Sequence, residues 1–164
     1  MNNINNVLCS MISYYAGDTK RINHFLKVYG FAKLIGAMEG LDDIQQEILE
    51  IAALTHDIGI KNSEIKYHSS SGNYQQTEGP PEAKKMLEEL AIDEDIIERV
   101  CWLIAHHHTY NNIDSMDYQI LVEADFLVNI FEDEMPGGAI RNIHEKIFKT
   151  ESGLKLLNDL YLMR

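Results

Sequence analysis

Four side chains able to bind a divalent metal ion lie in apolar stretches of the sequence, namely His24, His56, Asp57 and Asp125. A carboxylate buried among apolar groups is costly unless it is paired or binds a cation. Two imidazoles and two carboxylates form a mixed N/O ligand set that suits Mn²⁺, Fe²⁺, Co²⁺, Ni²⁺ or Zn²⁺. On an octahedral ion, four protein ligands leave two positions for water and substrate, as hydrolysis requires. These residue types therefore indicate metal-assisted hydrolysis, if the fold brings them together.

His24 lies on the apolar face of a predicted helix over residues 20–38. Val28, Phe31 and Ile35 follow it at 4, 7 and 11 positions, and such positions share one face of a helix. The side chain is therefore expected to point inward, either as a metal ligand or as an ordinary core histidine.

The His56-Asp57 pair lies near the end of a predicted helix over residues 43–59, with Gly59 as its expected C-cap. An aspartate there is disfavoured by the helix dipole, which stabilises cations at the C-terminus. A bound cation would offset that cost, and so would a buried salt bridge or a hydrogen bond to a loop.

Three adjacent histidines end a predicted helix over residues 94–109. Continuing the apolar row that contains Ile104 places His107 and His108 on the inner side and His106 on the outer side. The alternative is a polar cluster that caps the helix.

Asp125 lies at the flank of the apolar face of a predicted helix over residues 116–133. The alternative to a metal ion is a core salt bridge. No basic residue lies within helical reach, so such a partner must come from elsewhere in the fold.

The elements expected to position these residues are helices, because apolar residues recur at helical spacing and almost never alternate. The chain has 164 residues, of which 45 % are hydrophobic and 24 % charged, which favours one soluble all-α domain. The polar stretch 61–79 is predicted to be a long loop and a candidate lid, with Pro80-Pro81 in the first turn of the next helix. The helices are expected at 3–15, 20–38, 43–59, 80–90, 94–109, 116–133, 138–149 and 151–163.

The composition also limits the partners. A formal net charge of −12 repels a nucleic-acid polymer, while a small phosphorylated substrate remains compatible if bound metal reverses the local field. No apolar run is long enough for a membrane span, and the N-terminus resembles no targeting signal, so a cytoplasmic location is expected. Cys9 and Cys101 form no disulfide framework. A homo-oligomer is left open.

The ordered set of His24, the doublet within Leu54–Gly59, a histidine pair and Asp125 resembles the HD-domain superfamily of metal-dependent phosphohydrolases. The likeness covers about residues 20–133, with C-terminal helices at 138–163. It implies a single-domain helical bundle over 1–164 that holds a divalent ion at His24, His56, Asp57 and Asp125. It also implies a small phosphate ester, such as a nucleotide, as substrate.

One position departs from the two-metal members of that superfamily, which carry a further histidine where this chain has Gln75-Gln76. His107 and His108 resemble the pair that helps to hold a second ion, or they contact phosphate. His68 or Glu78 could substitute for the missing histidine, but neither is assigned as a ligand.

In the expected mechanism Asp57 orients a metal-activated water. Glu78 is a candidate general base, with a solvated surface carboxylate as the alternative. Lys61 and the inward histidines could contact phosphate oxygens. Two other functions stay open: a non-catalytic metal- or nucleotide-binding regulatory module, and an iron oxygenase on the same scaffold.

Overall fold

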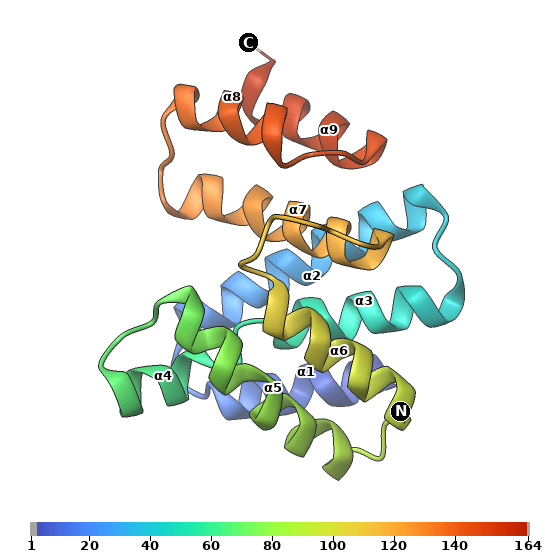
Figure 1. Cartoon of the computed structure of the whole chain (residues 1–164), viewed down its shortest axis with the longest axis vertical. Helices are drawn as coiled ribbons and strands as arrows, with labels where there is room; N and C mark the ends of the chain where they lie inside the picture. The colour runs from blue at the N-terminus through green and yellow to red at the C-terminus, as the bar shows by residue number, and fades with distance from the viewer. Residues whose placement is uncertain (1–2, 164) are drawn as a thin grey trace.

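The computed structural model describes residues 3–163, and this part of the chain is helical with no strand, which confirms the all-α fold class (Figure 1). None of the described helices is long and apolar enough to cross a bilayer. In chain order the helices are α1 (Asn3–Tyr14), α2 (Thr19–Glu39), α3 (Asp43–Thr55), α4 (Ile60–Tyr67), α5 (Gly72–Glu89), α6 (Glu94–His106), α7 (Met116–Glu132), α8 (Gly137–Lys146) and α9 (Glu151–Leu157), followed by a π-helical turn (Asn158–Leu162).

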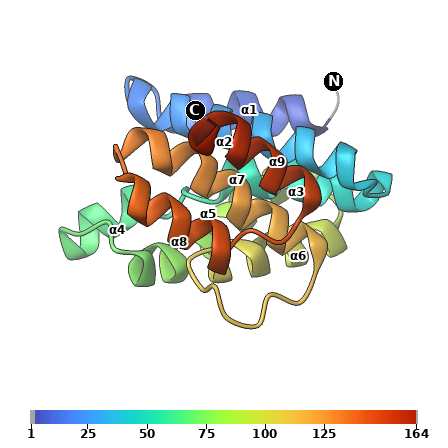
Figure 2. The same cartoon turned by 90° about the horizontal axis from the view of Figure 1, so that it is seen from above.

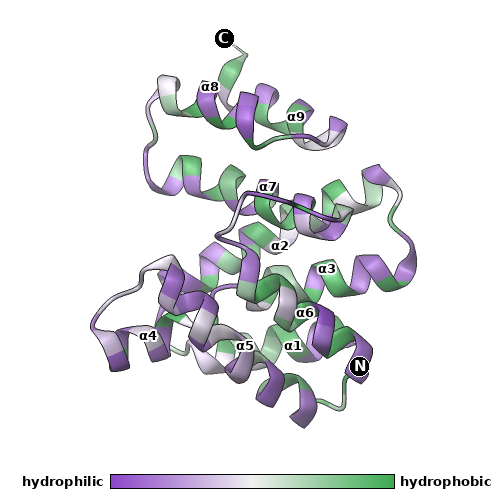
Figure 3. Ribbon diagram, viewed as in Figure 1, coloured by the Kyte–Doolittle hydropathy of each residue, from purple (hydrophilic) through white to green (hydrophobic). Residues whose placement is uncertain are grey.

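Helices α2, α3 and α7 pack against one another in the middle of the bundle. Helix α6 packs against α3, α5 packs against α6, and α4 packs against α5. Helix α9 packs against α2 and α7. Figure 1 shows α8 and α9 at one end of the molecule and α4 with α5 at the other, and Figure 2 gives the same arrangement from above. Apolar segments gather where the helices face each other (Figure 3).

Local signals in the sequence start and stop the central helices. The side chain of Asp18 accepts from the backbone N–H of Arg21 at the start of α2, and Asp42 caps α3 through the N–H of Gln45. These are standard N-cap interactions, which satisfy donors that the helix leaves free. Gly40 ends α2 with φ 75°, a left-handed conformation that glycine adopts without steric cost.

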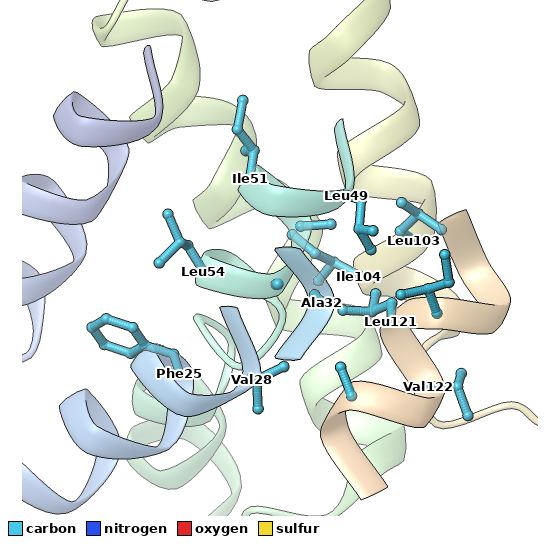
Figure 4. Packing of buried hydrophobic residues seen from close by; sticks show 14 of the residues in the cluster. Phe25, Val28, Ala32, Leu49, Ile51, Leu54, Leu103, Ile104, Leu121 and Val122 are labelled. Atoms are coloured by element: carbon cyan, nitrogen blue, oxygen red, sulfur yellow. The ribbon is translucent and has the colours of Figure 1, made fainter. Parts of the chain in front are cut away.

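Core residues lie close in sequence to the candidate histidines and aspartates. Val28 of α2, Leu54 of α3, Ile104 of α6 and Leu121 of α7 are fully buried and belong to one apolar cluster (Figure 4). Each lies within four residues of a histidine or aspartate named above. Packing of these side chains therefore positions the functional groups as well.

The long loop predicted for 61–79 is wrong, because α4 and α5 occupy most of it and only residues 68–71 are non-helical. Pro80 and Pro81 lie inside α5, not in its first turn. The sequence is misleading here because the buried positions of these helices include polar side chains, Ser63, Gln75 and Glu78, which hide the apolar periodicity. The lid hypothesis, which depended on a flexible loop, loses its basis.

Two helix ends also differ from the prediction. Helix α3 stops at Thr55 and α6 at His106, so His56, His107 and His108 lie just beyond these helices, whereas His24 lies within α2. Gly59 is not a C-cap but begins α4, with φ −71°. Its role is close packing: a Cβ on Gly59 would lie 2.6 Å from the carbonyl oxygen of Gln75 and 2.6 Å from the nitrogen of Gly79.

Candidate metal centre

Three helices deliver the four predicted ligands to one point between α2, α3 and α7. Nε2 of His24 lies 3.3 Å from Oδ2 of Asp57 and 3.3 Å from Oδ1 of Asp125. Nε2 of His56 lies 3.2 Å from Nε2 of His24 and 3.5 and 3.6 Å from the same two oxygens. The four ligand atoms of the sequence hypothesis thus lie together, although 101 positions separate His24 from Asp125 in the chain.

Backbone carbonyls determine how two of the inward imidazoles are oriented. Nδ1 of His56 donates to the carbonyl oxygen of Ala53, and Nδ1 of His107 donates to that of Ile104, each at 2.8 Å. A carbonyl oxygen can only accept, so Nδ1 carries the proton in both rings. In the neutral ring Nε2 then offers a lone pair, which is the form that binds a metal.

The ring of His107 extends the cluster by one donor. Its Nε2 is buried and has no hydrogen-bond partner among residues 3–163, and it lies 3.6 Å from Oδ1 of Asp57. Asp57 therefore faces His24 and His56 with one oxygen and His107 with the other. Buried polar atoms without a partner are uncommon in folded proteins. A cation at this point would satisfy the orphaned nitrogen.

The ring of His108 has its proton on the other nitrogen, Nε2. The amide of Gln75 donates from Nε2 to the carbonyl oxygen of Ser70 at 2.6 Å, so its Oε1 faces Nε2 of His108 at 3.0 Å. Nε2 of His108 is therefore the protonated nitrogen, and Nδ1 has the lone pair. His106 points away from the cluster and stacks on Trp102 with the ring centres 4.0 Å apart.

Charges within the cluster balance one another. Burial lowers the pKa of His56, but Asp57 and Asp125 raise it more, to about 9. The pKa of His24 is raised by the same carboxylates against the effect of burial. Burial raises the pKa values of Asp57 and Asp125, yet the histidines hold both well below the usual range. Protonated imidazoles thus neutralise the carboxylates, a role that a divalent cation can take over.

The donor set fits a divalent metal ion. Two groups of side chains have ligand atoms within 4.8 Å of one another, one of His24, His56 and Asp57 and the other of Asp57, His107 and His108. Imidazole and carboxylate ligands together are compatible with a first-row transition metal.

The two other residues predicted for catalysis have their hydrogen bonds elsewhere. Glu78 accepts from Nζ of Lys66 at 2.5 Å and from the hydroxyl of Tyr67 at 2.9 Å, contacts that lower its pKa. Nζ of Lys61 donates to the carbonyl oxygen of Tyr14 at 3.2 Å. His68 is exposed at the C-cap of α4. The structure records no contact of these three side chains with the His-Asp cluster among the described residues.

The sequence analysis missed three residues that support the ligands. Oδ1 of Asp125 accepts from Asn129 at 2.9 Å, and Nδ1 of His24 faces Oε2 of Glu132 at 2.8 Å. Lys27 in turn contacts Oε1 of Glu132 at 2.6 Å. The signal was present, because Asn129 and Glu132 follow Asp125 by 4 and 7 positions and so share its helix face.

Comparisons with known proteins identify the fold and the family of this chain. The crystal structure of a predicted HD superfamily hydrolase from an uncultured Thermotogales bacterium is similar to this chain, with a TM-score of 0.64 and 24 % sequence identity over 96 % of this chain and 83 % of that one. At this identity the likeness concerns the fold. No curated protein matches the sequence. A model of the HD domain matches residues 21–149, well over half of the chain. The protein therefore belongs to the HD domain family.

Proposed function

We propose that the protein is a metal-dependent phosphohydrolase that cleaves a small phosphate ester, of the nucleotide class, with a metal-activated water. The observation that supports this most is the convergence of four side chains, in which the Nε2 atoms of His24 and His56 lie 3.2 Å apart and each lies within 3.6 Å of a carboxylate oxygen of both Asp57 and Asp125. Family membership supports the same reaction class.

Within this proposal His24, His56, Asp57 and Asp125 hold a divalent ion of Mn, Fe, Co, Ni or Zn. When bound, such an ion makes a water more acidic and polarises a phosphoryl oxygen. Asp57 orients the attacking water, since its two oxygens face opposite sides of the cluster. His107 and His108 border the site on the side of Asp57 and contact either the phosphoryl group or a second ion.

Glu78 and Lys61 remain proposals for the general base and a phosphate contact. For Glu78 to take a proton, its ion pair with Lys66 must open. For Lys61 to reach substrate, its contact with the Tyr14 carbonyl must break. Glu78→Gln and Lys61→Met test these roles directly, because a role in chemistry predicts a lower kcat without loss of metal.

The experiment combines metal analysis with a substrate screen. Protein stripped with a chelator is reloaded separately with Mn²⁺, Fe²⁺, Co²⁺, Ni²⁺ or Zn²⁺, and phosphate release is measured with nucleotides and simple esters. Asp57→Ala should lose bound metal and activity together, while Asp133→Asn, an exposed aspartate on the end of α7, should keep both.

Three results would decide against the proposal. Wild-type protein that binds none of the five ions refutes the metal centre. Bound metal without phosphate release on any ester favours the regulatory module. Consumption of O₂ by the iron-loaded protein, without phosphate release, favours the oxygenase.

A further inference from the structure

His24 differs from the other inward histidines in what holds its Nδ1 nitrogen. The rings of His56 and His107 are held by backbone carbonyls three residues earlier, in the last turns of α3 and α6. The ring of His24 is held by a side chain, Glu132, which comes 108 positions later on α7. Its orientation therefore depends on a tertiary contact that a single substitution can remove.

Both oxygens of Glu132 are engaged by residues of α2. Oε2 lies 2.8 Å from Nδ1 of His24, and Oε1 lies 2.6 Å from Nζ of Lys27, one helical turn further along α2. The side chain of Glu132 is only 17 % exposed. The lysine thus fixes the carboxylate, and the carboxylate faces the ring nitrogen opposite to the one in the cluster.

The geometry determines which ring nitrogen of His24 is available. Ionised Glu132 can only accept, so its contact requires a proton on Nδ1. Its pKa is lowered despite burial, through Lys27 and His24. Nε2 lies 3.3 Å from both Asp57 and Asp125, so a cation bound to these carboxylates would meet the lone pair of the neutral ring. Carboxylate partners of this kind set the tautomer and raise the basicity of histidine ligands.

We propose that Glu132, fixed by Lys27, is a positioning residue that keeps the proton of His24 on Nδ1 and leaves Nε2 free for the metal ion. This inference rests on the metal centre proposed above. It also explains why Glu132 and Asn129 share the helix face of Asp125: α7 then supplies one ligand and the side chains that orient two ligands.

The test measures Zn²⁺ affinity by competition with a chromophoric chelator. Glu132→Ala should weaken binding by about 10- to 100-fold. Glu132→Gln should recover part of that loss, because its amide oxygen can still accept from Nδ1. Asp133→Asn removes one charge from the same helix end and should bind as wild type. Melting temperatures of the metal-free variants show whether the fold is kept.

A second readout does not need the metal. In the metal-free protein Glu132 competes with Asp57 and Asp125 for the ring proton of His24. Two-dimensional ¹H–¹⁵N spectra of the imidazoles, recorded at a pH where His24 is neutral, should therefore show a substantial share of the proton on Nδ1 in the wild type. In Glu132→Ala the proton should shift to Nε2, which faces Asp57 and Asp125, whereas a purely structural ion pair would leave the tautomer unchanged.

The outcomes separate this inference from the proposed function. If wild type binds Zn²⁺ and a folded Glu132→Ala variant binds it equally, the metal centre stands and the positioning role is refuted. If wild type binds no metal, the metal centre is refuted, and the tautomer spectrum still decides whether Glu132 sets the ring of His24.

Discussion

Metal binding should release protons, because the cluster holds them on the histidines when no ion is bound. With its pKa raised to about 9, His56 is about 99 % protonated at pH 7, since a difference of two pH units is a hundredfold ratio. A protonated imidazole cannot bind a metal. His56 alone therefore releases about one proton per ion at pH 7 and about half a proton at pH 9. His24, whose pKa is also raised, adds to both numbers.

The assay is isothermal titration of the metal-free protein with Zn²⁺ in buffers that differ in ionisation enthalpy. The slope of the observed enthalpy against the buffer enthalpy gives the number of protons released. The apparent affinity should fall by about tenfold or more for each pH unit below 7, because at least one proton competes with the metal. His106→Ala serves as a matched control, since this ring lies outside the cluster and should leave the slope unchanged. A slope near zero at pH 7 would refute the reasoning.

The same protonation makes the stability of the metal-free protein depend on pH. The pKa of His56 is higher in the folded protein, about 9, than in the unfolded chain, 6.5. Its protonation therefore stabilises the folded state fully below pH 6.5, and this stabilisation is lost as the pH rises through about 9. The difference of pKa corresponds to a free energy on the order of 3 kcal/mol. The lowered pKa values of Asp57 and Asp125 act in the opposite sense, so their contribution is lost as the pH falls below about 4.

Further predictions concern residues around the cluster. The melting temperature of metal-free protein should fall between pH 6.5 and pH 9.5, and the fall should be smaller with saturating Zn²⁺; a flat profile would contradict the charge balance described above. Substitution of His106 by alanine should leave phosphatase activity nearly intact, while alanine at His107 or His108 should impair it, and equal kcat/KM at all three positions would contradict this. Gly59→Ala should destabilise the protein by about 1–3 kcal/mol, because its Cβ meets backbone of α5. Gly30→Ala, where α2 has open space, should be neutral or stabilising by up to about 1 kcal/mol in urea denaturation.

The inward direction of the functional side chains follows from sequence alone. His24 and Asp125 lie on helices whose apolar residues recur at helical spacing, and such spacing determines which face is buried. The same helical spacing predicts that His107 points inward and His106 outward at the end of the 94–109 segment. The structure has His107 buried and His106 stacked on Trp102. Helical periodicity is a local property, so it can be read without knowing the fold.

The helices between residues 60 and 79 could not be predicted, because their buried polar side chains need hydrogen-bond partners from other segments. Helix α4 and the first half of α5, residues 72–79, were not recognisable, because Gln75 and Glu78 face into the protein through hydrogen bonds with His108, Lys66 and Tyr67. Such polar burial is favourable only where a distant segment supplies the matching group.

The residues that support the candidate metal centre could not be predicted from the sequence either. Nothing near His24 in the sequence indicates that Glu132, on a helix far along the chain, holds its ring. Spacing identifies which residues share a helix face, but only packing of α2 against α7 determines which two faces meet. The sequence alone therefore determines the types of the candidate ligands and their inward direction. The tertiary structure decides their distances, tautomers and charges, because these depend on contacts between segments that local periodicity does not encode.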